Sequence, residues 1–341
     1  DAGAGAIKVA QATRSRSRWT LADAAVVERA SAINAEPTSR QADADDEILG
    51  ALSLAERLQG RRAAGVLSMR DCEFHAVHVD PRDASPHKLQ QALSAAAPLA
   101  WRERTLDHWS IRNSPDVRDP QSPNVGVLSA PITRADRAAA DLGRAGLDCR
   151  QLDAAPAALA RAAGLMVGDS AAPMAVIDWG YSRATFVAVR HGQPLYVRPL
   201  RQCEFSQMLR AVGDAAGCSL SQAAVVLQQQ RLVGGASHGA ALADAVSRLC
   251  GEPLQRLQRE VRRTLEYLGS HRRHLAPKGI VLLGGGATIA GAAPWLTGAL
   301  GVETRVWRPD RQVLEVSDGL NVPVALLGEA VAASMLAWGK R

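Results

Sequence analysis

The 341-residue chain is poor in lysine and in aromatic residues and has no long apolar run, and each shortage excludes a class of protein. Aromatic residues make up 4% of the chain, and none is interleaved with its basic clusters, which argues against nucleic-acid binding. No run of about 18 uncharged apolar residues occurs, so we expect no membrane-spanning helix. Lysine accounts for four of the 40 basic residues, an arginine excess that we attribute to genome composition rather than to a binding partner.

Motifs for common catalytic and metal sites are missing as well. The five cysteines are scattered without a C-x-x-C pair, which predicts reduced thiols in a cytosolic protein and no zinc site. The chain has no H-E-x-x-H spacing, no G-x-S-x-G elbow and no glycine-rich loop ending in Gly-Lys-Ser/Thr. These absences exclude a histidine-bound catalytic metal, an α/β-hydrolase and a P-loop NTPase. The start lacks the pattern of a signal peptide and reads as part of a first strand, so we expect residues upstream of Asp1 to have been removed.

Two Asp-x-Gly turns and a glycine triplet are the most informative features that are present. One turn opens the chain at Asp1, the second begins at Asp178 after an apolar strand, and the triplet Gly284–Gly286 follows another apolar strand. Glycine lets a backbone approach a phosphate closely, and an aspartate can hold a metal-bound water. The turns therefore predict two hairpins that face one another across a cleft. The alternative interpretations are a turn-forming aspartate and a glycine loop leading into a helix.

The rest of the chain alternates strands and helices, which predicts an α/β protein with helices on the faces of its sheets. Strands are expected at 5–11, 19–28, 64–69, 73–79, 106–111, 125–130, 147–152, 174–179, 184–190, 194–200, 280–283 and 303–307. Helices are expected at 46–58, 85–93, 133–146, 156–163, 204–215, 221–230, 252–274, 291–300 and 323–338. The length predicts about two domains, which we place at 1–165 and 173–341, with a small inserted subdomain at 62–115.

This order of elements resembles the actin-like ATPase (FtsA/PilM) superfamily, and most of all its PilM-like type IV pilus assembly proteins. The resemblance rests on the opening motif Asp1, Gly3, Ile7 and Lys8, on the helix motif 260–267, on the strand–triplet–helix motif 280–302, and on Ala145–Leu147. It implies a two-lobed fold of duplicated RNase H-like domains that binds ATP and Mg²⁺ between the lobes.

The resemblance also implies roles for individual residues. Those expected to bind nucleotide or phosphate are Asp1, Gly3, Lys8, Asp178, Gly180, Ser182, Gly284, Gly285 and Gly286. Asp1 and Asp178 would hold Mg²⁺ through water, and Glu260 and Arg263 would contact the adenosine. An exposed ion pair between Glu260 and Arg263, three positions apart on one helix, is the alternative for those two.

Departures from the family pattern bear on activity. Ala4, Gly5 and Ala6 stand where hydroxyl residues are usual, so phosphate contacts at the first turn would come from the backbone alone. Trp179 and Tyr181 are bulky, and we expect Trp179 to crowd the nucleotide. No residue stands out as a general base, so the resemblance predicts a nucleotide-responsive scaffold and leaves weak ATPase activity open.

The expected partner is an extended peptide from a PilN-like membrane protein, received with the help of the 62–115 unit. The protein would then be cytoplasmic and peripheral at the inner face of the cytoplasmic membrane, with direct lipid contact through 14–18 or 271–274 as an alternative. A homo-oligomer stays open. Other members of the same superfamily fit the same order of elements: a GspL-like type II secretion component, an FtsA-like division protein, or a small-molecule kinase.

Overall fold

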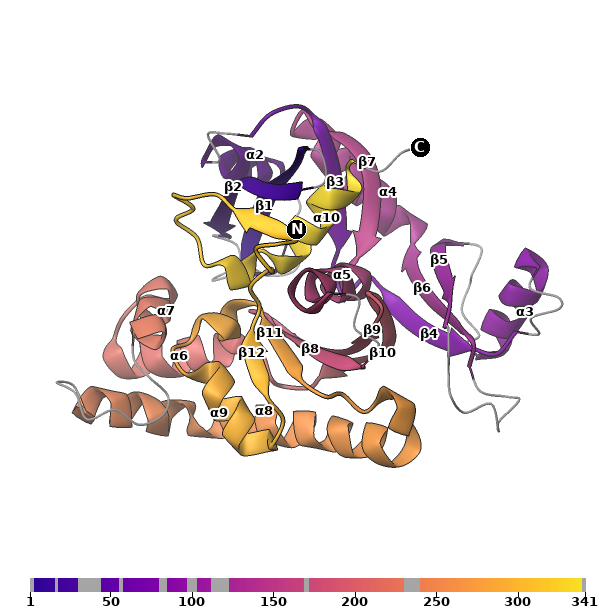
Figure 1. Cartoon of the computed structure of the whole chain (residues 1–341). Coiled ribbons are helices and arrows are strands. Elements are labelled where there is room, and N and C mark those ends of the chain that lie inside the picture. Colours follow the sequence, from indigo (N-terminus) through magenta and orange to yellow (C-terminus); the bar gives the residue numbers. More distant parts are fainter. Residues whose placement is uncertain are drawn as a thin grey trace.

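The computed structural model describes residues 3–15, 18–29, 44–54, 58–79, 85–96, 103–111, 123–168, 172–229 and 240–338. Asp1 and the predicted loop at 34–43 lie outside the described residues. The described part forms two lobes with a small three-stranded unit at one side (Figure 1). No helix among the described residues is both long and apolar enough to cross a lipid bilayer.

The first lobe is built around the N-terminal hairpin and a parallel strand pair. Its elements are β1 (Ala6–Ser15), β2 (Arg18–Glu28), α2 (Ala44–Leu54), β3 (Arg62–Leu67), α4 (Ile132–Arg144), β7 (Asp148–Ala154) and α5 (Ala155–Val167). Strands β1 and β2 are antiparallel, and β3 runs parallel to β7. Ile7 packs against α2 on one face of the hairpin, whereas Leu21 on the other face belongs to the core that includes α5.

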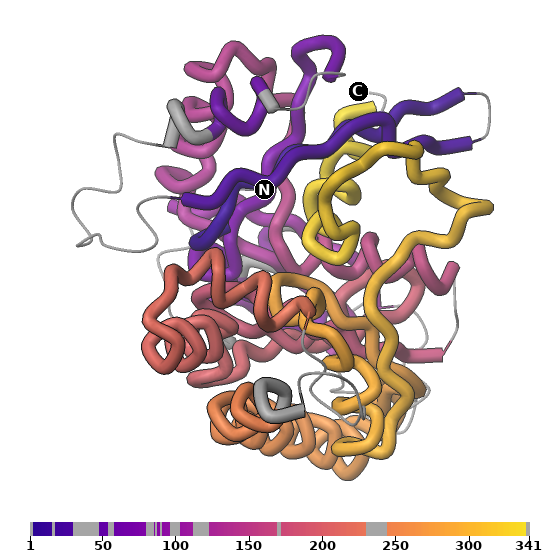
Figure 2. The backbone as a smooth tube through the Cα atoms, turned by 90° about the vertical axis from the view of Figure 1, so that its left-hand side faces the viewer, coloured from indigo at the N-terminus to yellow at the C-terminus, as the bar shows by residue number. Residues whose placement is uncertain are grey.

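The C-terminal end of the chain returns to this first lobe. Strand β13 (Leu314–Val316) runs parallel to β2, and α10 (Gly328–Leu336) packs against β1, β3 and α5. Figure 2 shows this last part of the chain lying beside the N-terminal hairpin. The sequence had placed all of 173–341 in the second domain, so these two elements correct that boundary. The C-terminal elements return to the first lobe because α10 packs over the otherwise open side of β1 and β3.

The inserted unit has different members from those predicted. It comprises β4 (Glu73–Val77), α3 (Pro86–Ala96), β5 (Arg104–Ser110) and β6 (Val125–Pro131), in the strand order β4-β6-β5. The predicted unit 62–115 included β3, which instead pairs with β7, and omitted β6, which pairs with both β4 and β5. The buried apolar run of β6 explains its central place in this sheet. In the structure the inserted unit extends from about residue 73 to residue 131.

The second lobe is a five-stranded sheet with the order β10-β9-β8-β11-β12. Its strands are β8 (Met174–Trp179), β9 (Ala184–Arg190), β10 (Gln193–Leu200), β11 (Ile280–Leu283) and β12 (Thr304–Val306). Strands β8, β11 and β12 are mutually parallel, whereas β9 and β10 are antiparallel to their neighbours.

Both faces of this sheet are covered. Ile177 and Phe186 face the helices of the second lobe, whereas Val176 and Val187 face α5 and α10. The helices on the first face are α6 (Phe205–Ala216), α7 (Leu220–Gln229), α8 (Ala240–His271) and α9 (Ala292–Leu300). Continuous apolar runs such as Ile280–Leu283 are buried on both sides, as expected for parallel strands in an α/β sheet.

Candidate functional site

A cavity of about 240 Å³ lies between the two lobes. Its wall includes the turn before β1, the end of β3, the turn after β8, the first parts of α6 and α7, the glycine triplet and the start of α10. Seven of the residues predicted from sequence line it: Gly3, Lys8, Asp178, Gly180, Ser182, Gly284 and Gly285. Asp1 lies outside the described residues. The structure therefore brings the described parts of both turns and two of the three triplet glycines to one place.

The second turn is held by the start of α6. The Phe205 amide donates to the Gly180 carbonyl at 3.0 Å, and the Ser206 amide donates to the Tyr181 carbonyl at 3.0 Å. These contacts satisfy amides at the start of the helix that have no partner within it. A Cβ on Gly180 would lie 2.8 Å from the Arg183 carbonyl oxygen, so the turn leaves no room for a side chain there.

The first turn lies directly against the second. A Cβ on Gly5 would come within 2.5 Å of Tyr181 Cγ, which means that the tyrosine ring rests on the glycine backbone. Arg29 supports the same turn, because its amide donates to the Gly5 carbonyl at 3.0 Å and its Nη1 donates to the Gly3 carbonyl at 3.3 Å. Tyr181 is therefore the bulky residue that occupies the space between the turns.

Trp179 lies elsewhere than the sequence predicted. Its side chain is 1% exposed and packs in the core against Phe205, and it does not line the cavity. The expectation that Trp179 crowds the nucleotide is wrong, because successive residues of β8 point to opposite faces of the sheet and place the indole in the helix-covered core. The bulky residue of this turn that lines the cavity is Tyr181.

Close packing leaves no room for a side chain at any position of the glycine triplet. Gly284 has φ +83°, and a Cβ there would press on the Asp178 carboxylate and lie 2.7 Å from the Trp179 carbonyl oxygen. At Gly285 a Cβ would lie 2.7 Å from Phe205, and at Gly286 it would overlap the Trp179 ring. Gly286 is buried and lines no part of the cavity, so its role is packing. Gly284 and Gly285 present backbone to the cavity.

Glu329 is a residue of the site that the sequence analysis missed. It lies in the first turn of α10, is 8% exposed and lines the cavity. Burial raises the pKa of Glu329 from its ordinary value to about 7, and the nearby charge of Asp178 adds to the rise whereas Lys8 opposes it. Burial also raises the pKa of Asp178, again opposed by Lys8. Three charged groups from β1, β8 and α10 thus meet at the floor of the cavity.

The cavity is more cationic than anionic. Among its described lining residues, the basic ones are Lys8, Arg29, Arg70 and Arg183, and the acidic ones are Glu28, Asp178 and Glu329. Arg183 Nη1 donates to the Met69 carbonyl at 3.3 Å, which ties the second turn to the end of β3. The cavity wall also has apolar members, which are Phe205, Leu209, Leu220, Ala224 and Leu326. A ligand with both anionic and apolar parts fits this mixed lining.

Glu260 and Arg263 do not reach the cavity. Glu260 accepts a hydrogen bond of 2.6 Å from Arg198 of β10, and Arg198 also donates to Thr264 at 2.6 Å. Arg263 is exposed on α8. The predicted adenosine contact is therefore not made by these residues in this structure, and Glu260 pairs with Arg198 instead of Arg263. The ion pair between Glu260 and Arg198 connects α8 with β10.

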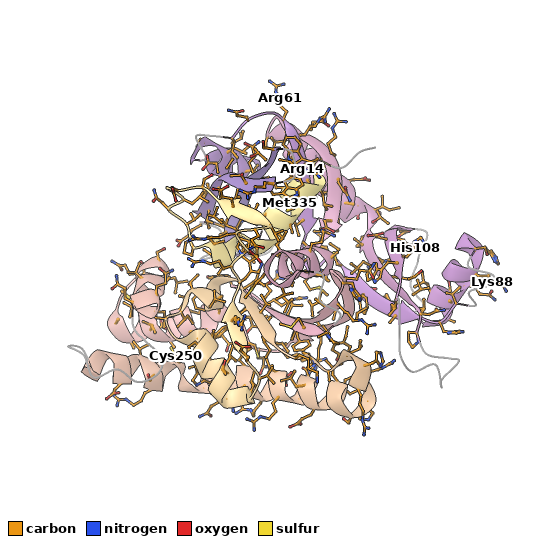
Figure 3. All side chains as sticks on the ribbon, in the orientation of Figure 1. Arg14, Arg61, Lys88, His108, Cys250 and Met335 are labelled. Atoms are coloured by element: carbon orange, nitrogen blue, oxygen red, sulfur yellow. The ribbon has the colours of Figure 1, made fainter. Side chains whose placement is uncertain are left out.

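A second concavity borders the inserted unit. This groove of about 920 Å³ lies between β5, α5 and the turn joining β9 and β10, with Ser110, Arg161, Arg190 and His191 in its wall. The pKa of Arg161 is lowered to about 10 by burial, and the charge of Asp107 on β5 opposes that shift. Figure 3 shows His108 on β5 and Lys88 on α3 at the side of the molecule that the inserted unit forms. In the strand order of the unit, β5 is an edge strand.

Comparison with known proteins identifies the fold. No known family profile matches the chain, and no curated protein matches its sequence. A solved structure described as the PilM-PilN type IV pilus biogenesis complex is similar to it, with a TM-score of 0.76 and 22% identity over 99% of this chain and 97% of that one. Ethanolamine utilization protein EutJ from Carboxydothermus hydrogenoformans is also similar, with a TM-score of 0.51 and 13% identity over 96% and 89%. The chain has the actin-like fold of PilM, and the predicted resemblance is confirmed at the level of the fold.

Proposed function

We propose that the chain is a nucleotide-binding scaffold of a type IV pilus or related secretion assembly, which docks a peptide from a membrane-anchored partner. The observation that carries this proposal is the match to the PilM-PilN complex along almost the whole length of both chains. Two concave sites fit the two halves of the proposal, one between the lobes for the nucleotide and one beside the inserted unit for the peptide.

The cavity between the lobes fits an adenine nucleotide. Gly180 and Gly284 line the cavity, and because glycine has no side chain a phosphate can approach their backbone closely. Lys8, Arg29 and Arg183 supply positive charge to the cavity wall, and the apolar residues that α6 and α7 contribute suit a base. The cavity volume is slightly below the range of about 300–1,000 Å³ common for ligand pockets, and Tyr181 fills the missing space.

Asp178, with Glu329 beside it, would hold Mg²⁺ on the phosphate side. The ion would neutralise phosphate charge there. The chain's own residues bind and orient: the glycine turns receive the phosphates, Lys8 balances their charge, and Ser182 offers a hydroxyl. This arrangement positions a nucleotide, and we infer a nucleotide-responsive scaffold for which weak ATPase activity stays open.

The groove beside β5 fits an extended peptide. An edge strand presents unpaired amides and carbonyls, to which a peptide can add as another strand while its alternate side chains enter pockets. The wall opposite β5 comes from α5 and the β9–β10 turn, so the groove also contacts the lobe that forms part of the nucleotide cavity. A peptide from a PilN-type partner would bring the protein to the inner face of the cytoplasmic membrane.

Site-specific crosslinking tests the docking half of the proposal. A photoreactive amino acid at Ser110, in the groove, should crosslink the cytoplasmic segment of a co-produced PilN-type membrane protein. The same group at Val306, an exposed position on the edge strand β12, is the control and should give no crosslink. Equal crosslinking from both positions, or none from Ser110, would refute docking in this groove.

A further inference from the structure

The strands of the two lobes follow the same plan, with one difference. In the second lobe the strand order is β10-β9-β8-β11-β12, so β8 lies between β9 and β11. In the first lobe β2 is antiparallel to β1 as β10 is to β9, and β3 is parallel to β7 as β11 is to β12. Among the described residues, however, β1 and β3 belong to separate sheets, and no strand joins them in the place that β8 takes.

The turns at Gly3 and Gly180 share one local geometry. A Cβ on Gly3 would lie 3.0 Å from the carbonyl oxygen of Ala6, three residues further along the chain. A Cβ on Gly180 would lie 2.8 Å from the carbonyl oxygen of Arg183, again three residues further. In the second lobe this turn connects β8 to the antiparallel strand β9. Because the same turn leads into β1 in the first lobe, the chain that enters it should run antiparallel to β1 and along its edge.

Another cavity, of about 190 Å³, lies between β1 and β3. Helices α2 and α4 cover one side of it and α10 covers the other, with Leu52, Leu142 and Ala330 among the apolar residues in its wall. It borders the cavity between the lobes, since Lys8 and Val66 line both. An extended segment in this space would be covered on both faces, as β8 is in the second lobe.

The edge of β1 that faces this cavity carries backbone groups that need hydrogen-bond partners. At its far end the Ala12 amide donates to Ser334 Oγ at 2.8 Å, and the Ala12 carbonyl accepts from Trp338 Nε1 at 2.7 Å. Because backbone groups alternate sides along a strand, the amide and carbonyl of Ala10 face the same edge. No strand among the described residues pairs with this edge. Side chains from the C-terminal end of the chain therefore satisfy Ala12, and the edge beside Ala10 is open to a strand.

We propose that this cavity is the seat of a further β-strand, formed by the segment of the polypeptide that leads into the turn at Gly3. The strand lies between β1 and β3, antiparallel to β1 and parallel to β3, and joins the two sheets of the first lobe into one. Its length is that of β8, which has 6 residues, and it is apolar on both faces. Neither nucleotide binding nor peptide docking is a premise of this inference.

Backbone hydrogen exchange, measured by NMR on two extended forms of the full chain, tests the seat. One form carries Met-Ala-Val-Ile before Asp1, a copy of residues 174–177 of β8. Its matched control carries Met-Pro-Val-Pro, because proline donates no hydrogen bond and is excluded from central strands. The apolar extension should slow exchange of the Ala10 amide at least tenfold relative to that of Val9, which faces β2, and the control should change this ratio less than twofold. An unchanged ratio with the apolar extension, or an equal change with the control, would overturn the proposal.

A free peptide distinguishes a strand of the same polypeptide from one that another molecule supplies. The hexapeptide Met-Ala-Val-Ile-Asp-Ala, added to the unextended chain at an equal concentration, should leave the exchange of the Ala10 amide unchanged. Protection by the free peptide as strong as that by the extension would mean that the seat receives a strand from a partner, and would overturn the assignment to the chain's own segment. Both measurements omit nucleotide and membrane partner, so their outcome is independent of the proposed function.

Discussion

Ser221 on α7 donates a hydrogen bond of 2.5 Å to the carboxylate of Glu28 at the end of β2. The two residues are 193 positions apart in the sequence and belong to different lobes. Both line the cavity between the lobes, so this bond joins the lobes at the cavity wall. Its position makes it a contact that must break if the lobes are to separate and admit a ligand.

Replacing Ser221 by alanine should loosen this side of the cavity. An exposed hydrogen bond contributes about 0.5–1 kcal/mol, so we expect a bound fluorescent adenine nucleotide to dissociate about two to five times faster. Stopped-flow displacement by unlabelled nucleotide measures this rate. Ser270→Ala removes a comparable hydroxyl within α8, where it donates to the Glu266 carbonyl, and should leave the rate unchanged. Identical rates in the two variants would show that the bond between Ser221 and Glu28 does not control access.

Replacing Tyr181 by alanine should tighten nucleotide binding. The ring rests on Gly5 and must move before phosphates can approach the first turn. We expect affinity for ATP to rise about tenfold, which corresponds to about 1.4 kcal/mol. Equilibrium titration measures it, with Tyr267→Ala on α8, where the ring contacts Tyr196 and His271, as the control. Weaker binding in Tyr181→Ala would mean that the ring contacts the nucleotide instead of obstructing it.

Two glycine-to-alanine variants separate packing from helix propensity. Gly286→Ala places a methyl group into the Trp179 ring and should lower the free energy of unfolding by about 1–3 kcal/mol. Gly298→Ala lies within α9, where a Cβ would meet nothing within 4 Å, and should raise it by up to about 1 kcal/mol. Denaturant unfolding measures both values. Equal effects would mean that Gly286 is not held tightly against Trp179.

Glu329 should make the stability of the fold fall as pH rises. Its pKa is about 7 in the folded chain, above the ordinary 4.5, so the folded state holds a proton that the unfolded chain releases. The stabilisation is complete below pH 4.5 and is lost as pH rises through 7. Between pH 6 and pH 8 the free energy of unfolding should drop by roughly 1 kcal/mol because of this group.

Denaturant unfolding of matched variants at pH 6 and pH 8 checks the assignment. Glu329→Gln should remove most of this drop, since an amide does not titrate. Glu303→Gln, at an exposed position paired with Arg305, should keep it. If Glu329→Gln loses as much stability between the two pH values as the wild type, another group is responsible.

Most of the fold could be predicted from sequence because its signals are local. The apolar runs of β8 and β11 predict these two strands directly. Gly146 and Gly301 predict the ends of the helices before them, and both have positive φ in the structure. Strand β13 was missed because it has three residues and no periodic pattern. Helix α8 begins at Ala240, well before the predicted start at 252, and the alanines of this segment are strong helix formers.

The errors in the site arise from tertiary contacts that the local sequence does not contain. Glu329 reads as an ordinary acidic residue in the first turn of a helix, and only the return of α10 to the first lobe places it beside Asp178. Glu260 and Arg263 were assigned from a motif on a 32-residue helix, and the face they occupy is set by the packing of α8 on β10. The inserted unit was drawn wrongly because strand partners far apart in sequence, such as β3 and β7, leave no local mark.

Isothermal titration of the full chain with ATP and Mg²⁺ tests the central claim most directly. The account predicts one binding site, with a melting temperature that rises as the ligand is added; the stabilisation should approach about 2.7 kcal/mol at a hundredfold excess over the dissociation constant. Lys8→Ala should weaken this binding. Lys8 is the positively charged side chain that lowers the pKa of both Asp178 and Glu329. No heat and no shift in melting temperature at millimolar ATP and Mg²⁺ would contradict nucleotide binding in the cavity.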